Sequence, residues 1–521
     1  MSSPADPASL APEPIVARAS IRRNVAHMAT SQAVTWALAT ASAVIVPRFI
    51  GPSDVGKWRV ATSVWGIVGV VVTFGTTLQI QRAIARNQRE GLALINPVLL
   101  IRTVAFGVAS AIMLPAALLV GSTGQTLLIG ALVGVPVLVG LWSEVYLAAF
   151  VGLERMATNS AVNVFTRATQ LLLTIAALWA GTGMIGVLVV TLIGAVAGLA
   201  LVLRQFLRLD VPRPRPRWRD SWTVLLASMP LMVVMLAQTT YRQLDVLVIA
   251  RLAGSRDVGW YGAADVLVGS LFFPTTVVMS TVFPTLGRTY AQDRAAFEQL
   301  IRRTFSLLLL LSTPVGFGAM VVAPAFSTLL LGDEFAGSGS VVSIMSIVTM
   351  FTFGATLFAY AAAAAGRELF VGVLLFAMAA LTIPLDLLFV PWASDRWDNG
   401  AIGGALSYVV TEAIQFVVGL VVIAPFLISR SVAWRSARVL LAGGLMALAV
   451  WPLRDVFVIV PAAVGAVVYA LAILALRALD GDQREMLSGA LARLRRAAPG
   501  GPETPADGDP GSSTDGPPGP G

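Results

Sequence analysis

Long apolar stretches constrain this chain more than any other feature of its sequence. Of its 521 residues, 57% are hydrophobic and only 12% are charged. A soluble domain carries roughly 25% charged residues, so this chain has too few charges to cover the surface of a soluble protein of its length. A helix needs about 20 mainly apolar residues to cross the hydrocarbon core of a bilayer. We therefore expect an all-α polytopic membrane protein.

Fourteen segments are long and apolar enough to be membrane spans. The sequence predicts them at approximately 25–46, 60–80, 98–120, 126–150, 159–180, 184–206, 222–249, 261–286, 304–331, 339–365, 369–391, 401–427, 438–453 and 456–477.

Cysteine and histidine usage excludes several kinds of site. The chain has no cysteine and a single histidine, His27, which rules out a disulfide scaffold and a cysteine nucleophile. Zinc, haem and iron–sulfur centres depend on the same residue types, so we expect no metal and no cofactor. A membrane-bound saccharide polymerase or ligase would need a large outward loop, and no predicted outward loop exceeds about fifteen residues. We therefore do not expect an enzyme.

The distribution of positive charge predicts the orientation of the spans. Lys57 is the one lysine among 36 cationic residues, and the net charge is +8. With the N-terminus in the cytoplasm, 26 of the 36 fall in cytoplasmic segments and seven in outward segments, as the positive-inside rule requires. We expect both termini to be cytoplasmic. The arginines form short clusters between apolar runs and not the basic patch of a nucleic-acid binder, so no nucleic-acid partner is expected. The seven outward residues are Arg48, Lys57, Arg59, Arg251, Arg256, Arg396 and Arg454.

Two predicted outward segments, 48–58 and 251–261, carry the same motif. Gly51, Asp54, Val55 and Gly56 recur as Gly254, Asp257, Val258 and Gly259 at an offset of 203 residues. Each motif joins an outgoing span to a returning one, so equivalent spans share an orientation. This pattern predicts a parallel repeat of two six-helix lobes around a central cavity, followed by two extra C-terminal helices.

The repeat gives a domain organisation. We predict a disordered cytoplasmic N-terminus (1–20), an N-lobe (21–206), a cytoplasmic linker (207–221), a C-lobe (222–428), two further spans (429–478), an amphipathic cytoplasmic segment (479–497) and a disordered tail (498–521).

Five short motifs resemble a known family. They are Gly-Pro-Ser-Asp-Val-Gly at 51–56, Asp-Val-Gly-Trp-Tyr-Gly-Ala-Ala at 257–264, Phe-Pro-Thr-Leu at 283–286, Leu-Gly-Asp-Glu-Phe at 331–335 and Gly-Gly-Ala-Leu-Ser-Tyr-Val-Val-Thr-Glu at 403–412. In order and spacing they resemble the Wzx-like polysaccharide flippases of the multidrug/oligosaccharidyl-lipid/polysaccharide (MOP) exporter superfamily, over roughly residues 20–430. The resemblance implies a transporter that moves lipid-linked oligosaccharides across a prokaryotic inner or plasma membrane for cell-surface polysaccharide synthesis.

Polar residues inside the spans are candidates for the binding site, because a charge at mid-membrane needs a partner or a wet cavity. They recur at helical spacing on single faces of spans 5, 7 and 12. A guanidinium matches phosphate oxygens, so the arginines are candidates for gripping a pyrophosphate. The candidate substrate-binding residues are Arg102, Asn163, Arg167, Gln170, Gln238, Arg242, Tyr408 and Gln415.

The candidate ion-coupling residues are Glu144, Glu412 and Asp245, which would bind H⁺ or Na⁺. Their alternative role is helix-to-helix pairing. Glu144 and Arg167 lie at similar depth and could pair, and Arg242 and Asp245 are three residues apart on one face.

These observations predict a flippase that moves polyprenyl-pyrophosphate-linked oligosaccharide from the cytoplasmic to the outer leaflet by alternating access. The expected partners are this substrate, membrane lipids and the polysaccharide polymerase or glycosyltransferase machinery. A cation-coupled multidrug exporter of the same superfamily and a lipid II flippase remain as alternatives.

Overall fold

A computed structural model describes residues 21–119, 124–209 and 218–479. The predicted terminal segments, and most of the linker and amphipathic segment, lie outside these residues. The first half of the chain forms α1 (Ile21–Thr73), α2 (Thr76–Arg86), α3 (Gln88–Ala93), α4 (Ile95–Leu119), α5 (Gly124–Gly152), α6 (Met156–Trp179) and α7 (Gly183–Leu207). The second half forms α8 (Trp218–Leu252), α9 (Ser255–Ser270), α10 (Phe273–Gln292), α11 (Arg294–Leu331), α12 (Ala336–Ala364), α13 (Glu368–Trp397), α14 (Gly400–Val422), α15 (Arg430–Val450) and α16 (Ile459–Ala475). Short 3₁₀ turns lie at Asp333–Phe335, Pro425–Leu427 and Trp451–Leu453.

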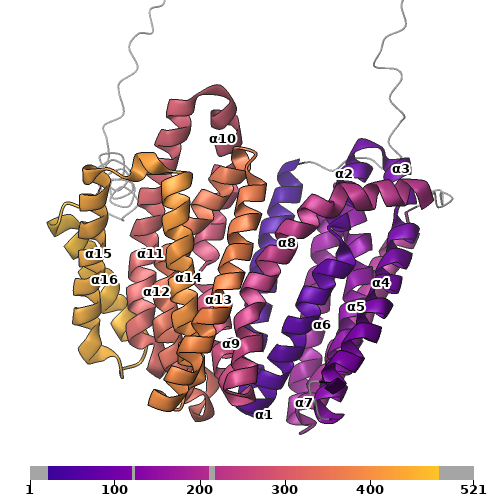
Figure 1. Ribbon diagram of the computed structural model, residues 1–521, viewed down its shortest axis with the longest axis horizontal. Helices are drawn as coiled ribbons and strands as arrows, with labels where there is room; N and C mark the ends of the chain where they lie inside the picture. Colours follow the sequence, from indigo (N-terminus) through magenta and orange to yellow (C-terminus); the bar gives the residue numbers. More distant parts are fainter. Residues whose placement is uncertain (1–20, 120–123, 210–217, 480–521) are drawn as a thin grey trace, which may run out of the picture.

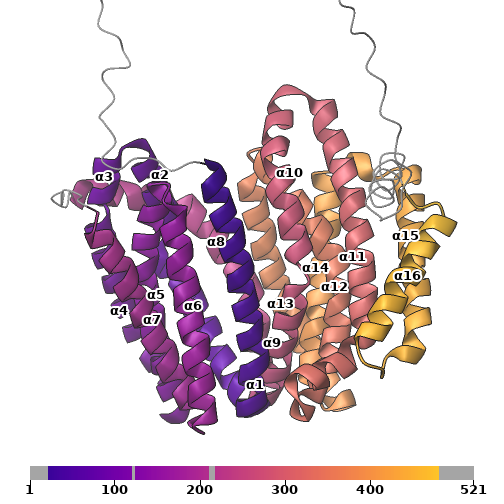
Figure 2. The same ribbon diagram turned by 180° about the vertical axis from the view of Figure 1, so that it is seen from behind.

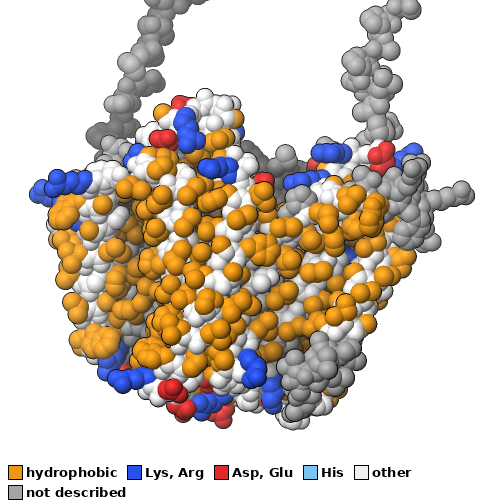
Figure 3. Space-filling view, in the orientation of Figure 1, with side chains coloured by type: hydrophobic (Ala, Val, Ile, Leu, Met, Phe, Trp, Pro, Cys, Tyr) orange, Lys and Arg blue, Asp and Glu red, His pale blue; other side chains and the backbone are white. Residues whose placement is uncertain are grey.

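The described residues form helices and no strands, which confirms the expected fold class. Ten helices are long and apolar enough to cross a membrane, or eleven when α9 and α10, bent by 45° at their junction, are taken as one span. Adding α8 and the shorter α16, and counting α1 as two spans, gives the fourteen expected. A broad apolar surface covers the middle of the molecule, with Lys, Arg, Asp and Glu at its two ends (Figure 3). The chain is a multi-pass membrane protein.

The helices form two bundles side by side (Figures 1 and 2). In the first, α1 packs against α4–α7; in the second, α11 and α12 pack against each other and α13 packs against both α8 and α14. Helices α15 and α16 flank the second bundle against α11, where Tyr469 donates a hydrogen bond to the Leu310 carbonyl at 3.0 Å. The long helix α8 contacts both α2 of the first bundle and α13 of the second.

Both copies of the repeated motif break their helix at the same place. Gly51 has φ 72° and ψ 166°, and Gly254 has φ 91° and ψ −177°. A side chain makes positive φ unfavourable for most residues, which explains the glycine in each copy. The segment 48–58 is therefore a kink inside α1 and not the loop that the sequence predicts, because the helix resumes directly after Gly51. The shared geometry supports the parallel repeat.

The two repeated motifs also touch each other. A Cβ on Gly56 would overlap the backbone carbonyl of Ser255, and a Cβ on Gly259 would overlap that of Pro52. These contacts are reciprocal, because Pro52 and Ser255 are themselves separated by the repeat offset of 203. The bundles are thus joined backbone to backbone at this end of the molecule, called here the motif end.

Candidate functional site

Polar side chains link the two bundles just inside the motif end. Arg59 of α1 forms an ion pair with Asp265 of α9, and both side chains are partly buried. Ser63 donates to the Gln243 side chain at 2.8 Å, and the Ser53 and Ser255 hydroxyls lie 2.9 Å apart. The sequence reading placed Arg59 in an outward loop. Because α1 continues through the motif, Arg59 instead lies on the helix and faces the second bundle.

Arg242 lies on the same side of the second bundle as this network. Its side chain is exposed and close enough to Asp265 and Glu412 to interact electrostatically. The expected pairing with Asp245 is wrong, because Asp245 is buried and accepts a 2.5 Å hydrogen bond from Tyr261. Arg59 and Arg242, from different bundles, thus share Asp265 as an anionic neighbour.

Glu144 pairs with Arg102 and not with Arg167, which corrects the sequence prediction. The distance from Arg102 Nη1 to Glu144 Oε2 is 3.2 Å. Arg102 also donates to the Leu141 carbonyl and to the hydroxyls of Thr76 and Thr77, and it is 0% exposed. A guanidinium enclosed in this way cannot reach a substrate in this conformation. Glu144 is held by Arg102 and by Thr77 at 2.7 Å, with 41% of its side chain exposed.

The polar face of α6 is partly packed against α7 and partly exposed. Thr166 and Gln170 pack against Gly198 and Gly194 of α7, and Asn163 donates to the backbone of Asn159. These three residues therefore do not all face an open cavity as expected. Arg167 is exposed, about 200–220° around the helix from the exposed Phe165 and Leu172. It therefore lies on the side of α6 opposite these apolar residues.

Glu412 lies inside the second bundle. It accepts hydrogen bonds from Thr352 at 2.8 Å and Tyr241 at 3.1 Å, and so joins α14 to α12 and α8. Tyr408 is half-buried beside the Tyr241 ring. Gln238 is exposed on α8. Gln415 lies between α12, α13 and α14, near Phe358 and Leu374. The face of α14 that carries Gln415 points into the second bundle. Gln415 is therefore not close to the candidate arginines.

A pair of carboxyl groups lies beside Tyr261. Asp386 of α13 is 0% exposed and lies close enough to Asp245 of α8 and to Ser407 of α14 to interact with both. Asp245 Oδ1 and both oxygens of Asp386 are buried without a hydrogen bond of ordinary geometry to a described residue. Two buried carboxylates side by side repel unless a proton or cation lies between them. No cluster of three His, Cys, Asp or Glu residues occurs in the described part of the chain, so a cation here would depend on these two carboxylates and neutral oxygens.

Comparisons with known proteins agree with this architecture. The family described as polysaccharide biosynthesis protein matches residues 21–290, slightly more than half of the chain. The chain belongs to this family. A second family, MatE, matches residues 230–388. No curated protein sequence matches the chain.

Solved structures show the same fold. A lipid II flippase, MurJ, in an inward closed conformation has a TM-score of 0.67 at 11% identity, covering 88% of this chain and 99% of that one. An inward-facing multidrug resistance MATE family transporter has a TM-score of 0.60 at 16% identity, covering 75% and 94%. A MOP superfamily transporter from Pyrococcus furiosus has a TM-score of 0.53 at 13% identity, covering 78% and 95%. The chain therefore shares the fold of these flippase and exporter structures.

Two charged residues of this chain are missing from the candidates that the sequence predicts. Arg59 is missed because it belongs to a motif that reads as a turn. Asp386 is missed although it lies within the predicted span 369–391, where an isolated acidic residue is itself a signal of function. Its place beside Asp245 depends on the packing of α13 against α8, which the sequence does not reveal.

Proposed function

We propose that this transporter is a flippase for polyprenyl-pyrophosphate-linked oligosaccharide, moving it from the cytoplasmic to the outer leaflet by alternating access. Both termini are cytoplasmic in this proposal, and the motif end faces outward. The saccharide and pyrophosphate pass between the two bundles while the lipid tail stays in the bilayer. Polysaccharide polymerase and glycosyltransferase machinery acts before and after this step, and the chain itself catalyses no reaction.

One observation carries the proposal: Arg59 and Arg242, from opposite bundles, share a single acidic neighbour, Asp265. Two guanidinium groups present forked donors to the oxygens of a pyrophosphate. An anionic head group would compete with Asp265 for Arg59 and so weaken the contact that holds the bundles together. Arg167, on α6 of the first bundle, is assigned to the same head group. Arg102 is assigned a positioning role toward Glu144.

We further propose that H⁺ or Na⁺ drives the cycle through the Asp245–Asp386 pair. A cation there offsets the repulsion between the two carboxylates, and both helices that hold them contact each other within the second bundle. Among the residues selected from the sequence for coupling, Asp245 is favoured over Glu412, whose carboxylate already accepts two hydrogen bonds.

The test uses a strain that lacks this gene. Lipid-linked saccharide is extracted and its leaflet is read with an impermeant probe. The proposal expects saccharide to accumulate on the cytoplasmic leaflet, to clear with the wild-type chain, and to remain with Arg59→Gln or Arg242→Gln. Arg454→Gln is the matched control, because Arg454 is exposed and pairs with the exposed Asp455. Normal lipid pools in the deletion strain would overturn the proposal.

A cation-coupled drug exporter is the second candidate, favoured by the same carboxylate pair. It predicts normal lipid pools together with altered tolerance to cationic drugs in the deletion strain. Accumulation of the peptidoglycan precursor, with other lipid-linked saccharides unchanged, would instead identify a lipid II flippase.

A further inference from the structure

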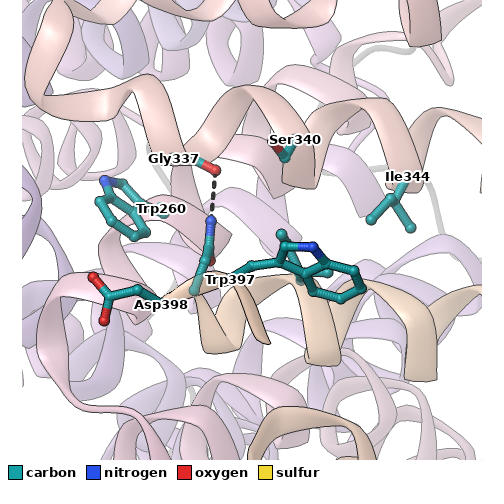
Figure 4. A pocket seen from close by; sticks show the side chains of 8 residues that line it. Trp260, Gly337, Ser340, Ile344, Trp397 and Asp398 are labelled. Atoms are coloured by element: carbon teal, nitrogen blue, oxygen red, sulfur yellow. Dashed lines mark hydrogen bonds between the residues drawn. The ribbon is translucent and has the colours of Figure 1, made fainter. Parts of the chain in front are cut away.

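A cavity lined by polar and apolar side chains lies at the motif end, apart from Arg59, Arg167 and Arg242. Its volume is about 510 Å³, within the range of about 300–1,000 Å³ that is usual for small-molecule sites. It lies between the start of α9, the start of α12 and the junction of α13 with α14. Figure 4 shows Trp260 and Asp398 at one side of it and Ile344 at the other, with Trp397 between them. The other lining residues are Gly337, Ser340, Asn399 and Ile402.

The scaffold around this cavity is fixed by hydrogen bonds. Asn399 donates to the Gly337 carbonyl at 2.9 Å (Figure 4), and Trp260 donates through its indole N–H to the Glu334 carbonyl at 2.9 Å. Asp257 accepts from the backbone N–H of Gly400 at 2.7 Å. The repeated aspartate therefore anchors the turn that carries Asp398 and Asn399.

Three polar groups remain available to a ligand. Asn399 is 5% exposed, and its Oδ1 atom has no described hydrogen-bond donor; a buried acceptor without a partner is costly and favours a bound donor. Asp398, held in a left-handed conformation at φ 51°, binds Arg256 through Oδ2 at 3.1 Å and keeps 90% of its side chain exposed. Ser340 is also exposed.

Aromatic rings complete the site. Trp397 is 49% exposed and offers the open ring. The ring of Trp260 is covered by Arg256 at 4.6 Å and packs against Gly337, so Trp260 forms part of the cavity wall. An indole face gives a large apolar platform, and carboxylate and amide oxygens beside it accept hydrogen bonds from hydroxyl groups. A pyranose ring matches both features, because its apolar C–H face can stack on an indole and its hydroxyl groups can donate to the acceptors.

We propose that this cavity is a saccharide subsite that binds a pyranose ring through Trp397, Asp398 and the Asn399 side-chain oxygen, with Trp260 as part of its wall. Its assignment to the transported saccharide rests on the proposed function, and its position in the repeated motif places it beside the contact through which the cargo would leave. A saccharide that reaches the outer face from elsewhere would present the same chemistry.

The test measures sugar binding to the full chain in nanodiscs by saturation-transfer NMR. The probes are the methyl pyranosides of glucose, galactose, mannose and N-acetylglucosamine. We expect at least one to bind, and its affinity to fall at least tenfold in Trp397→Ala and in Ser340→Trp. The second variant fills the cavity without removing a scaffold contact. Trp451→Ala is the matched control, because Trp451 is 54% exposed and has Arg454 over its ring at 4.6 Å.

Absence of binding by the wild-type chain, or binding retained in both variants, overturns the subsite. An equal loss in Trp451→Ala also overturns it and assigns the tryptophans to membrane-interface anchoring. Ser340→Trp in the deletion strain separates the two sources: accumulated lipid-linked saccharide identifies the transported cargo, and normal pools identify an external saccharide. Normal pools in the deletion strain itself reject the flippase but leave the NMR result standing.

Discussion

At the residue scale, the charged residues within the helices of this protein divide into enclosed and exposed groups. Arg102 is enclosed, with hydrogen bonds to two threonines and a carbonyl besides its ion pair with Glu144. Arg167 is exposed and forms no described ion pair. The same residue type in the same bundle therefore has two different environments. The proposed function assigns a structural role to Arg102 and contact with the substrate to Arg167.

This contrast predicts opposite phenotypes. Arg102→Ala removes a buried side chain and leaves its partners without a donor, so we expect it to lower stability by roughly 3 kcal/mol. Arg167→Ala should leave stability unchanged and abolish export. Thermal unfolding in detergent measures the first and lipid-linked saccharide accumulation the second. Unchanged unfolding of Arg102→Ala, or full export by Arg167→Ala, would contradict this division.

The carboxylate pair gives a second prediction at this scale. A cation that binds the folded state raises its stability, so the wild-type chain should unfold at a higher temperature in Na⁺, or at lower pH, than in a bulky organic cation at neutral pH. Asp386→Asn should lose this response because it removes one of the two charges. Asp395→Asn, at an exposed position on the same helix, is the control. An identical response in Asp386→Asn would refute a cation site at the pair.

Much of the candidate site is hidden from the sequence at this scale. Helical spacing puts Gln238, Tyr241, Arg242 and Asp245 on one face of α8, but the structure splits this face: Tyr241 and Asp245 point into the bundle, whereas Gln238 and Arg242 are exposed. Helical periodicity shows which residues share a face of α8, but it does not show which neighbouring helix covers each part of that face. Depth alone likewise favoured Arg167 over Arg102 as the partner of Glu144, whereas the structure pairs Glu144 with Arg102.

At the element scale, glycine determines where spans turn at the motif end. Gly51, Gly254 and Gly332 all have positive φ with extended ψ. Each ends one helical segment directly before the next begins. Apolar length and arginine position predict the spans well, because the bilayer imposes both. The kink at Gly51 is less predictable, since a Gly-Pro pair reads equally as a loop.

Gly254→Ala tests this backbone requirement. No atom lies within 4 Å of the added Cβ, so the cost comes from the positive φ and should be about 1–2 kcal/mol. Gly269→Ala in the same helix α9 also has open space around its Cβ but an ordinary φ, and we expect it to be neutral or slightly stabilising. Thermal unfolding of the two variants checks the prediction; equal stabilities would contradict it.

At the scale of the whole molecule, the two motifs act as one contact between the bundles. Gly56 and Gly259 allow backbone contact, and the Arg59–Asp265 pair, the Ser63–Gln243 bond and the Ser53–Ser255 contact lie around them. Alternating access requires these contacts to separate in each cycle. The repeat could be detected in the sequence, but its consequence could not, because nothing in the chain shows that the two copies touch.

The most direct test of this account locks the motif end. The chain has no cysteine, so Ser53→Cys with Ser255→Cys introduces the only pair, at positions whose hydroxyls lie 2.9 Å apart. The leaflet distribution of polyprenyl-pyrophosphate-linked saccharide is then measured in cells under oxidising and reducing conditions, with each single-cysteine variant as a control. The account predicts that oxidation cross-links the pair and traps the saccharide on the cytoplasmic leaflet, and that reduction restores its export. Continued export with the pair fully cross-linked would contradict it.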